Sequence, residues 1–417
     1  MSVENLSEKL FKPKFKYLET SLISNSGVPL PELCKKNGAF GYFLGWYRPV
    51  HRFWWVMQGG NIADIEECLS AVASSKGERS REDCYDTVAV YGGGNWIFEF
   101  SKCAQARALE GRRLREAGDL EKAAHQFRMS ARYFSIASYP HLKGDVMAAE
   151  AALLGRRSYR EMCECESETV KLTDFKFKAS DQEISGLLHM PDHDRVHPCV
   201  ILLASYEMSA TGFYRLYKER LRPNGIALLV LEMPGMGLSE KLTLKADQAE
   251  VLNAALIALK KFPGIDSTRI GLLGLRLGGS ACLRTTIMSP SEVRALALIE
   301  PAVHSFFTDR NILNSLTLCL RSLYANRLNQ DASRWDLVIP QLKQLSLKEQ
   351  GLISRNSANP VPCMAASLNC YSSAEDLSLL EANFKDFSYM VKKDQDYSDF
   401  MFEALNNASE FFKEHLL

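Results

Sequence analysis

Four short runs of consecutive apolar residues in the second half of the chain constrain its fold more than any other feature of the sequence. They cover residues 199–204, 226–231, 270–273 and 295–299. A strand with one face in water alternates apolar and polar residues, whereas a strand that is apolar throughout is buried on both faces. The runs therefore predict a mostly parallel sheet with helices on each side.

The segments around these runs complete a doubly wound α/β pattern. Residues 170–178 and 182–189 alternate apolar and polar side chains, which predicts an antiparallel pair of strands ahead of the first run. Helix-compatible segments at 212–221 and 248–261 separate the next strands, as in repeated βα units. Two further strands are expected at 361–368 and 387–392.

The first half of the chain has a helical period instead. Ile62, Ile65, Leu69 and Val72 follow the i, i+3, i+4 spacing of an amphipathic helix, and further helices are expected between residues 102 and 159. We expect a helical N-terminal domain over 1–165 and an α/β domain over 166–417. Residues 306–355 form a largely helical stretch too long for an ordinary connection, which predicts a cap inserted over the ends of the strands.

The turn after the third apolar run carries the most chemical information. It reads Gly274-Leu275-Arg276-Leu277-Gly278 and leads into helix-compatible sequence. A strand, a G-x-X-x-G turn and a helix form the nucleophile elbow of α/β-hydrolases, whose central residue is held in a strained backbone conformation. The amide of the next residue, here Leu277, can face a developing oxyanion at the start of the helix.

The centre of this turn is Arg276, which cannot act as an acyl-transfer nucleophile because a guanidinium stays cationic. Ser280 lies one helical turn later and is either the nucleophile or a packing residue that bonds to a backbone carbonyl. The late loop, where hydrolases place their histidine, contains none. His304 follows a core strand and is either at the rim of the site or structural, and His415 is expected in solvent.

Two more loops should reach the same edge of the sheet. Ser205, Tyr206 and Glu207 follow the first apolar run, where hydrolases place a second oxyanion donor, and Glu232 follows the second run. Burial of one arginine at this edge requires compensating charge. We therefore expect Glu207 and Glu232 to pair with Arg276 in a closed pocket.

Composition and the remaining motifs exclude several classes of function. Fifty basic residues balance fifty acidic ones, which argues against a nucleic-acid-binding face. The first residues lack the apolar segment of a signal peptide, and no apolar run approaches the twenty residues of a membrane span, so we expect a cytoplasmic protein. Cys163 and Cys165 lack partners at zinc-binding spacing, and Gly92-Gly93-Gly94 lacks the lysine of a phosphate-binding loop. No metal or other cofactor is expected.

Several segments spread over nearly the whole chain point to one family. They include Trp46-Tyr47-Arg48, Tyr139-Pro140-His141-Leu142-Lys143-Gly144-Asp145, Gly274-Leu275-Arg276-Leu277-Gly278 and Ser346-Leu347-Lys348-Glu349-Gln350-Gly351. With these segments the chain resembles the FrsA esterases, the fermentation–respiration switch family of gamma-proteobacteria, which also carries arginine at the centre of the turn.

This resemblance implies an α/β-hydrolase core, hydrolysis of small carboxylic esters, and a regulatory partner, the glucose-specific IIA component of the sugar phosphotransferase system. The chain departs from the family around the expected site: it has Ser205-Tyr206-Glu207 in place of Gly-x-Asp, Glu232 in place of Asp, and Cys370-Tyr371 in place of Gly-Asp. Its substrate can therefore differ. The alternative is a regulatory binding protein that has lost catalysis.

Overall fold

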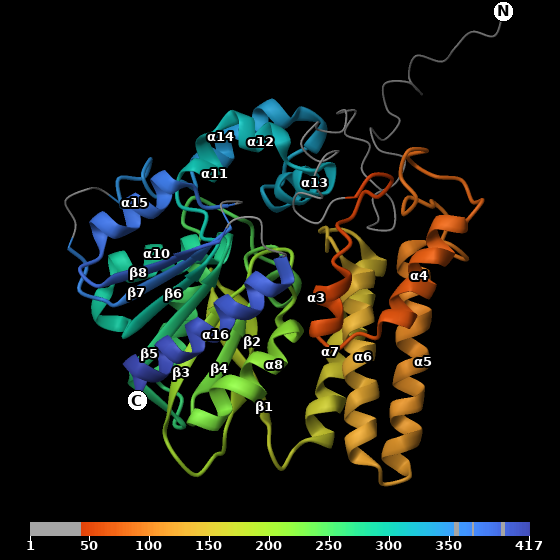
Figure 1. Cartoon of the computed structure of the whole chain (residues 1–417), viewed down its shortest axis with the longest axis horizontal. Coiled ribbons are helices and arrows are strands. Elements are labelled where there is room, and N and C mark those ends of the chain that lie inside the picture. The colour runs from red at the N-terminus through yellow and green to blue at the C-terminus, as the bar shows by residue number, and fades with distance from the viewer. Residues whose placement is uncertain (1–42, 354–357, 369–370, 393–396) are drawn as a thin grey trace, which may run out of the picture.

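The computed structural model describes residues 43–353, 358–368, 371–392 and 397–417. Its centre is an eight-stranded sheet with the order β1-β2-β4-β3-β5-β6-β7-β8 (Figure 1). β1 and β2 are antiparallel to their neighbours, and β3 to β8 run parallel. The strands are β1 Lys171–Ala179, β2 Gln182–Met190, β3 His197–Leu203, β4 Ala227–Leu231, β5 Ile265–Leu275, β6 Ala295–Ile299, β7 Cys363–Ser367 and β8 Phe387–Val391.

The apolar runs form the central strands because both faces of the sheet are covered. Cys199 and Ile201 of β3 pack into one buried cluster with helices α9 (Glu250–Leu259) and α10 (Leu277–Met288). Val200 and Leu202, which point the other way, pack into a second cluster with α16 (Tyr397–Leu416). The predicted fold class is therefore confirmed. The segment expected as a helix over 212–221 is helical throughout, but its type changes from 3-10 (Ala210–Phe213) to α (α8, Tyr214–Leu216) and then to π (Tyr217–Leu221).

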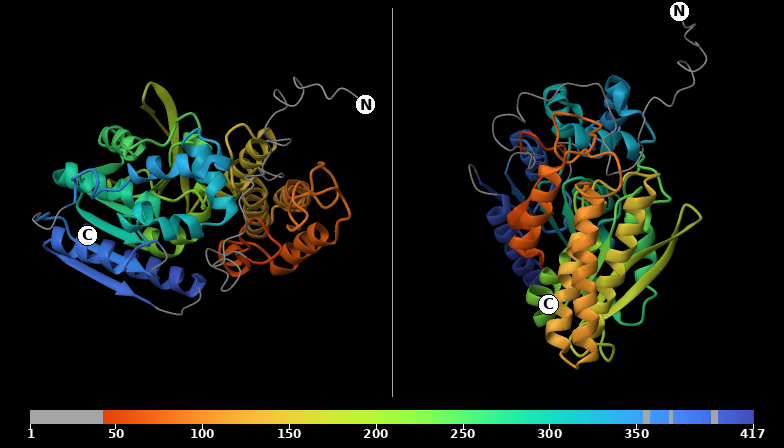
Figure 2. Two further views of the ribbon diagram at one scale, coloured as in Figure 1. Left: turned by 90° about the horizontal axis from the view of Figure 1, so that it is seen from above. Right: turned by 90° about the vertical axis from the view of Figure 1, so that its right-hand side faces the viewer.

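The helices before the sheet pack beside it as a bundle (Figures 1 and 2). We call this part, α3 to α7, the helical domain. Its turns follow the capping rules: Asn95, after the glycine turn at 92–94, accepts a hydrogen bond from Phe98 N–H, and Asp119 accepts one from Lys122 N–H. The helices are α3 Arg52–Met57, α4 Ile62–Ser74, α5 Trp96–Glu116, α6 Leu120–Ser138 and α7 Val146–Cys165.

Tryptophan side chains bury the segment that precedes the first helix of the helical domain. Trp46 and Trp55 both pack edge-on against Trp96, with ring centroids 6.3 and 6.4 Å apart. Buried Arg48 lies over the Trp96 ring at 5.1 Å and pairs with Asp86 at 3.1 Å, so a buried charge here is neutralised locally.

Four helices between β6 and β7 lie over the carboxyl edge of the sheet (Figure 1). We call them the cap: α11 Ser305–Thr308, α12 Arg310–Ser315, α13 Leu318–Arg327 and α14 Trp335–Lys343. The expected cap boundary at residue 355 and the residues 1–42 of the expected helical domain lie outside the described residues. After β7, α15 (Ala374–Asn383) leads to β8.

The cap is fastened to both other parts of the molecule by the end of α13. Arg327 is fully buried, donates from Nη2 to the Pro140 carbonyl at 2.9 Å, and lies over the Tyr206 ring at 5.2 Å. Its neighbour Asn326 accepts a hydrogen bond from Lys143 N–H at 2.8 Å. Two adjacent residues of the cap therefore bind the helical domain, and one of them also contacts the core.

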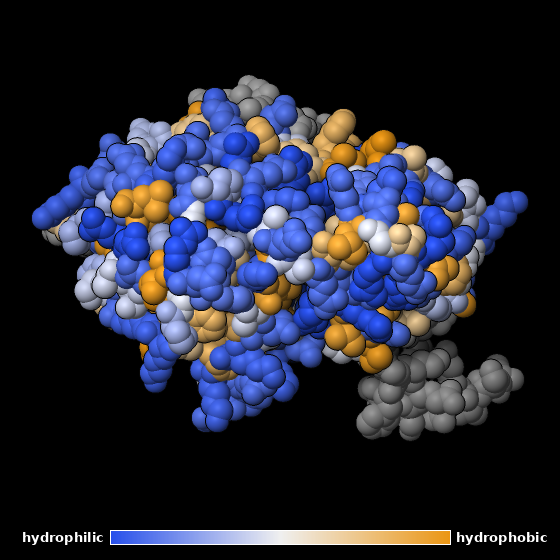
Figure 3. All heavy atoms as spheres, turned by 90° about the horizontal axis from the view of Figure 1, so that it is seen from below, coloured by the Kyte–Doolittle hydropathy of each residue, from blue (hydrophilic) through white to orange (hydrophobic). Residues whose placement is uncertain are grey.

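The surface seen from below is mainly polar (Figure 3). The face seen from below in Figure 3 shows polar side chains interspersed with small apolar patches. Among the described helices, none is both long enough and apolar enough to cross a membrane.

Candidate active site

The turn between β5 and α10 has the geometry that its glycines predict. Arg276 has φ 51° and ψ −116°, a conformation that side chains rarely adopt. A Cβ on Gly274 would lie 2.5 Å from Gly279 Cα, and one on Gly278 would lie 2.0 Å from the Leu203 carbonyl oxygen. Larger residues would separate strand from helix, so this sharp turn requires glycine at both positions.

Neighbouring strands hold the backbone of this turn in place. Arg276 N–H donates to the Ile299 carbonyl at the end of β6, at 2.9 Å, and the Arg276 carbonyl accepts from Ala302 N–H at 3.1 Å. Leu277 is the first residue of α10, and the first N–H groups of a helix have no partner within it. Its amide is therefore suited to receive a developing negative charge.

The Arg276 side chain is buried against one carboxylate and two aromatic rings. Its Nη1 lies 3.1 Å from Glu207 Oε1, and each side chain is 8% exposed. The guanidinium carbon lies 4.7 Å from the Tyr371 ring centre and 5.2 Å from that of Tyr397, close enough for cation–π attraction. These contacts join the ends of β3 and β5 to the start of α16.

The pair is ionised. Burial acts against the charge on Arg276, but Tyr397, Tyr371 and Glu207 more than compensate, and the pKa of Arg276 lies well above its ordinary value. Burial likewise raises the pKa of Glu207, but the Arg276 cation, the Ser205 hydroxyl and the Tyr371 hydroxyl, which donates to Oε1 at 2.6 Å, hold it below its usual range. Within the described residues, Glu207 Oε2 accepts no hydrogen bond although it is buried.

Glu300, which sequence reasoning missed, shapes the other side of the pocket. It follows β6 with a positive φ of 52° and accepts hydrogen bonds from Leu368 N–H and from Tyr371 N–H, the latter at 2.9 Å. It thereby holds the loop after β7, which brings Tyr371 over Arg276. A glutamate directly after a core strand was the available signal. Cys370, the neighbouring residue in the expected family difference, lies outside the described residues.

The prediction that Glu232 pairs with Arg276 is wrong. Within the described residues no ion pair joins the two. Glu232 Oε1 instead accepts from Ala210 N–H at 2.8 Å, and Oε2 from Leu238 N–H at 2.7 Å. Backbone donors satisfy both oxygens, so Glu232 ties together the loops that follow β3 and β4.

The other residues of the loop after β3 have different surroundings. Tyr206 is fully buried, and its hydroxyl donates to the Pro234 carbonyl at 2.8 Å, which is a packing contact between loops. Ser205 is also fully buried, and its hydroxyl lies beside the Glu207 carboxyl and helps to lower its pKa. Of the three predicted residues here, Glu207 alone contacts Arg276 directly.

Ser280 and His304 make structural contacts away from the guanidinium. The Ser280 hydroxyl donates to the Ala302 carbonyl and is buried within the helix–loop packing. His304 donates its backbone N–H to Asp376 at 2.9 Å, and its Nδ1 lies 2.8 Å from Ser346 Oγ. Both contacts favour the packing alternatives over roles in catalysis.

A narrow cavity continues from Glu207 toward the helical domain. Its volume is about 40 Å³, room for about three water molecules. His51 and His141, which belong to the helical part of the chain, both line this cavity. The sequence did not predict them for the site, because hydrolases place their histidine late in the chain. Burial, together with Arg327, Arg156 and Arg132, lowers the pKa of His141 to about 3, so this imidazole is neutral.

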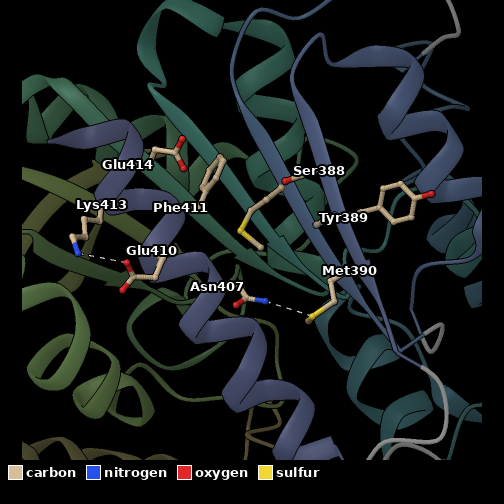
Figure 4. Close-up of a pocket in the computed structure, with 10 residues that line it drawn as sticks. Ser388, Tyr389, Met390, Asn407, Glu410, Phe411, Lys413 and Glu414 are labelled. Carbon is tan, nitrogen blue, oxygen red and sulfur yellow. Dashed lines mark hydrogen bonds and ion pairs between the residues drawn. The ribbon is translucent and has the colours of Figure 1, made fainter.

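A larger groove of about 570 Å³ lies elsewhere, between β8 and α16 (Figure 4). Tyr389 and Met390 of β8 and Asn407, Glu410 and Phe411 of α16 line it. It contains none of the residues that the sequence predicts for the site. Among the described residues, no group of three or more His, Cys, Asp or Glu side chains is arranged to hold a metal ion.

Comparison with known proteins identifies the family. The family described as "Esterase FrsA-like" matches residues 1–417. Esterase FrsA of Photobacterium profundum is 32% identical over 88% of this chain and 87% of its own length, and esterase FrsA of Klebsiella pneumoniae strain 342 is 33% identical over 87% and 86%.

Solved structures agree on the fold. The 2,6-dihydroxy-pseudo-oxynicotine hydrolase superposes with a TM-score of 0.66 at 16% identity, over 87% of this chain and 95% of that one. Wild-type AbyA5 superposes with a TM-score of 0.63 at 16% identity, over 85% and 95%. The chain therefore belongs to the FrsA-like esterase family and has an α/β-hydrolase fold.

Proposed function

We propose that this protein hydrolyses small carboxylic esters at Arg276, with water in place of a serine nucleophile. The observation that carries the proposal is the ion pair of Arg276 and Glu207, buried at the strained turn where hydrolases present their reactive side chain. Family membership supports the class of reaction. Ser280 is excluded from the reaction scheme because its hydroxyl is engaged by the Ala302 carbonyl.

The residues suit a general-base reaction. Glu207 Oε2, which has no partner among the described residues, accepts a proton as a water oxygen attacks the ester carbonyl carbon. The carbonyl π electrons move to the oxygen, which the Leu277 amide and the Arg276 cation stabilise. The intermediate collapses, the C–O bond to the alcohol breaks, and Glu207 returns the proton to the alkoxide. Because the pKa of Glu207 is low, it is a weak base, and we expect slow turnover.

Hydrolysis of p-nitrophenyl acetate and butyrate by the purified protein tests this scheme. Glu207→Gln removes the base, and we expect its rate to fall by about 100-fold or more. Arg276→Lys keeps a positive charge beside Glu207, so Glu207 stays paired and the fold is preserved. A lower rate in this variant therefore reports loss of the reaction and not loss of the fold. Arg284→Gln, half-buried on α10 and paired with Asp247, is the matched control and should keep the wild-type rate.

Two results would contradict the scheme: a wild-type rate equal to the buffer rate, or full activity in both Glu207→Gln and Arg276→Ala. Circular dichroism of each variant, recorded at the assay temperature, shows whether it is folded.

We also propose a second candidate function, a cytoplasmic regulatory protein that binds the glucose-specific IIA phosphotransferase component and so links carbon supply to fermentation or respiration. Mutual neutralisation of Arg276 and Glu207 favours it, because a self-satisfied pair has less need of a substrate. Pull-down with phosphorylated and unphosphorylated IIA component tests it. Association in neither state would remove this candidate.

A further inference from the structure

The outer side of β8 has no partner strand in the described part of the chain. β8 is the last strand of the sheet and pairs with β7 alone, and Figure 2 shows it at the margin of the sheet. All five residues of β7 are buried, whereas Ser388 and Tyr389 of β8 are exposed and the rest of β8 is half-buried. An edge of this kind offers a row of backbone N–H and C=O groups to another strand.

The register with β7 determines which backbone groups of β8 point outward. The Asp386 carbonyl accepts a hydrogen bond from β7 at 2.9 Å, and the Lys392 N–H donates one to β7 at 3.0 Å. In a ladder, the N–H and C=O groups of alternate residues point to the same neighbour, so the even-numbered residues of β8 face β7. The backbone groups of Phe387, Tyr389 and Val391 therefore point away from the sheet, and within the described residues none of them makes a hydrogen bond.

β8 lacks the features that usually prevent edge strands from pairing. Between residues 387 and 391 it has no lysine, no proline and no bulge. On one face, Tyr389 is 54% exposed and its ring stacks on that of Phe387, with centroids 5.7 Å apart. On the other face lies the groove of about 570 Å³ between β8 and α16 (Figure 4). Both faces of the edge therefore leave room for the side chains of another strand.

The sequence of β8 is complementary to itself in the antiparallel direction. A symmetric pair that uses all three outward-facing residues has to be centred on Tyr389. Tyr389 then lies opposite Tyr389 of the second copy, and Phe387 lies opposite Val391. Each of these residues can donate one backbone hydrogen bond and accept another, and their apolar side chains share one face of the joined sheet.

The charges at the ends of β8 match in the same register. Asp386 lies three residues before Tyr389 and Lys392 three residues after it, so each acidic end meets a basic end of the second copy. Asp386 is exposed and makes no ion pair within the described residues. Lys392 binds Glu403 at 2.9 Å, and its ammonium group retains further hydrogen atoms to donate.

We propose that two copies of this chain pair antiparallel through β8, about a two-fold axis at Tyr389, and so join their sheets into one. The match of β8 to itself, in apolar pairs and in charge, favours a second copy over a strand of another protein. The proposal does not depend on ester hydrolysis. Because one pair of strands is a small interface, we expect a dissociation constant on the order of 10 µM.

Analytical ultracentrifugation of the full chain, from about 1 to about 100 µM, measures this association. Tyr389→Pro removes an N–H that points away from β7, so the sheet within each copy is preserved. We expect this variant to associate at least about ten-fold more weakly than wild type, because it loses two central hydrogen bonds of the pair. Tyr389→Phe keeps the ring and the N–H and should associate within about two-fold of wild type.

A charge exchange tests the register. Asp386→Lys and Lys392→Asp each place like charges opposite one another, and each variant alone should associate about ten-fold more weakly than wild type. A mixture of these two variants restores opposite charges at both ends and should form mixed dimers of about wild-type affinity. Arg157→Glu, exposed on α7, changes the net charge by the same amount as Lys392→Asp and should leave association unchanged.

Circular dichroism shows that each variant is folded before it is compared. A wild-type chain that sediments as a monomer at about 100 µM would overturn the pairing. Equal association of wild type and a folded Tyr389→Pro variant would place the interface elsewhere. A mixture of the two charge variants that associates no better than either alone would overturn the register centred on Tyr389.

Discussion

Nη1 of Arg276 and Oε1 of Glu207 lie 3.1 Å apart in a pocket where each side chain is 8% exposed. Tyr371 donates a hydrogen bond to the same oxygen and covers the guanidinium with its ring. A pair this well buried is costly to break, because either partner left alone is an uncompensated charge.

Glu207→Gln should therefore lower the free energy of unfolding by about 3–5 kcal/mol, measured by urea denaturation. The double variant Glu207→Gln, Arg276→Met removes both charges and should recover part of that loss. If the double variant is less stable than Glu207→Gln alone, the pair does not account for the effect.

The ion pair also predicts a dependence of stability on acid. Since the folded-state pKa of Glu207 is below its ordinary value of 4.5, the unfolded chain binds the proton more readily. The contribution of Glu207 is present above pH 4.5 and is lost as the pH falls through the lower, folded-state pKa. As the pH is lowered from about 6 to about 3, the melting temperature should fall more steeply in wild type than in Glu207→Gln.

His141 predicts a second acid dependence at higher pH. Its pKa falls from 6.5 to about 3 on folding, so between these values the unfolded chain binds a proton that the folded chain does not. Stability should decline as the pH is lowered from 6.5 toward 3. His141→Asn, chosen because asparagine tolerates the positive φ at this position, should show a shallower decline. An unchanged slope would mean that His141 is protonated in the folded protein.

Glu232 predicts a purely structural effect. Glu232→Ala leaves the N–H groups of Ala210 and Leu238 without acceptors and should cost about 1–3 kcal/mol for each group that stays buried. Glu240→Ala, exposed at the end of the same turn, is the control and should change stability by less than about 0.5 kcal/mol. Chemical denaturation compares the two.

Ser280 separates the water scheme from a serine mechanism. Ser280→Ala should leave ester hydrolysis within about two-fold of wild type and cost about 1 kcal/mol of stability, the worth of one buried hydrogen bond. Loss of hydrolysis in a folded Ser280→Ala protein would show that this hydroxyl takes part in the reaction.

The sheet could be predicted from the sequence because burial on both faces leaves a direct trace, a run such as residues 199–204 with no polar interruption. The turn at Arg276 could be predicted because its backbone geometry requires glycine at fixed offsets. Glu207 could be matched to Arg276 because both follow core strands, whose carboxyl ends share one edge of the sheet.

The remaining contacts of the site depend on distances that no local pattern encodes. Tyr371 and Glu207 are hydrogen-bonded although they lie 164 positions apart in the sequence. Glu300 holds the loop that carries Tyr371 by accepting a hydrogen bond from its backbone N–H. Glu232 follows a core strand at the same edge and carries the right charge, but its two oxygens bind the backbone N–H groups of Ala210 and Leu238 and not Arg276. His141 comes from the helical domain. Hydrolases place their histidine after the last strand, so their residue order does not point to this part of the chain.

Arg327 ties the cap to the helical domain and to the core. Since this one side chain bonds to Pro140 and lies against Tyr206, a hinge that lifted the cap alone would break both contacts and leave Asn326 as the partner of a buried guanidinium. The cap is thus held to both other parts of the molecule, and we do not expect it to open on its own. The cavity that His51, His141 and Glu207 line lies between the helical domain and Glu207, so we expect an effector that shifts the helical domain to change access to this side of the pocket.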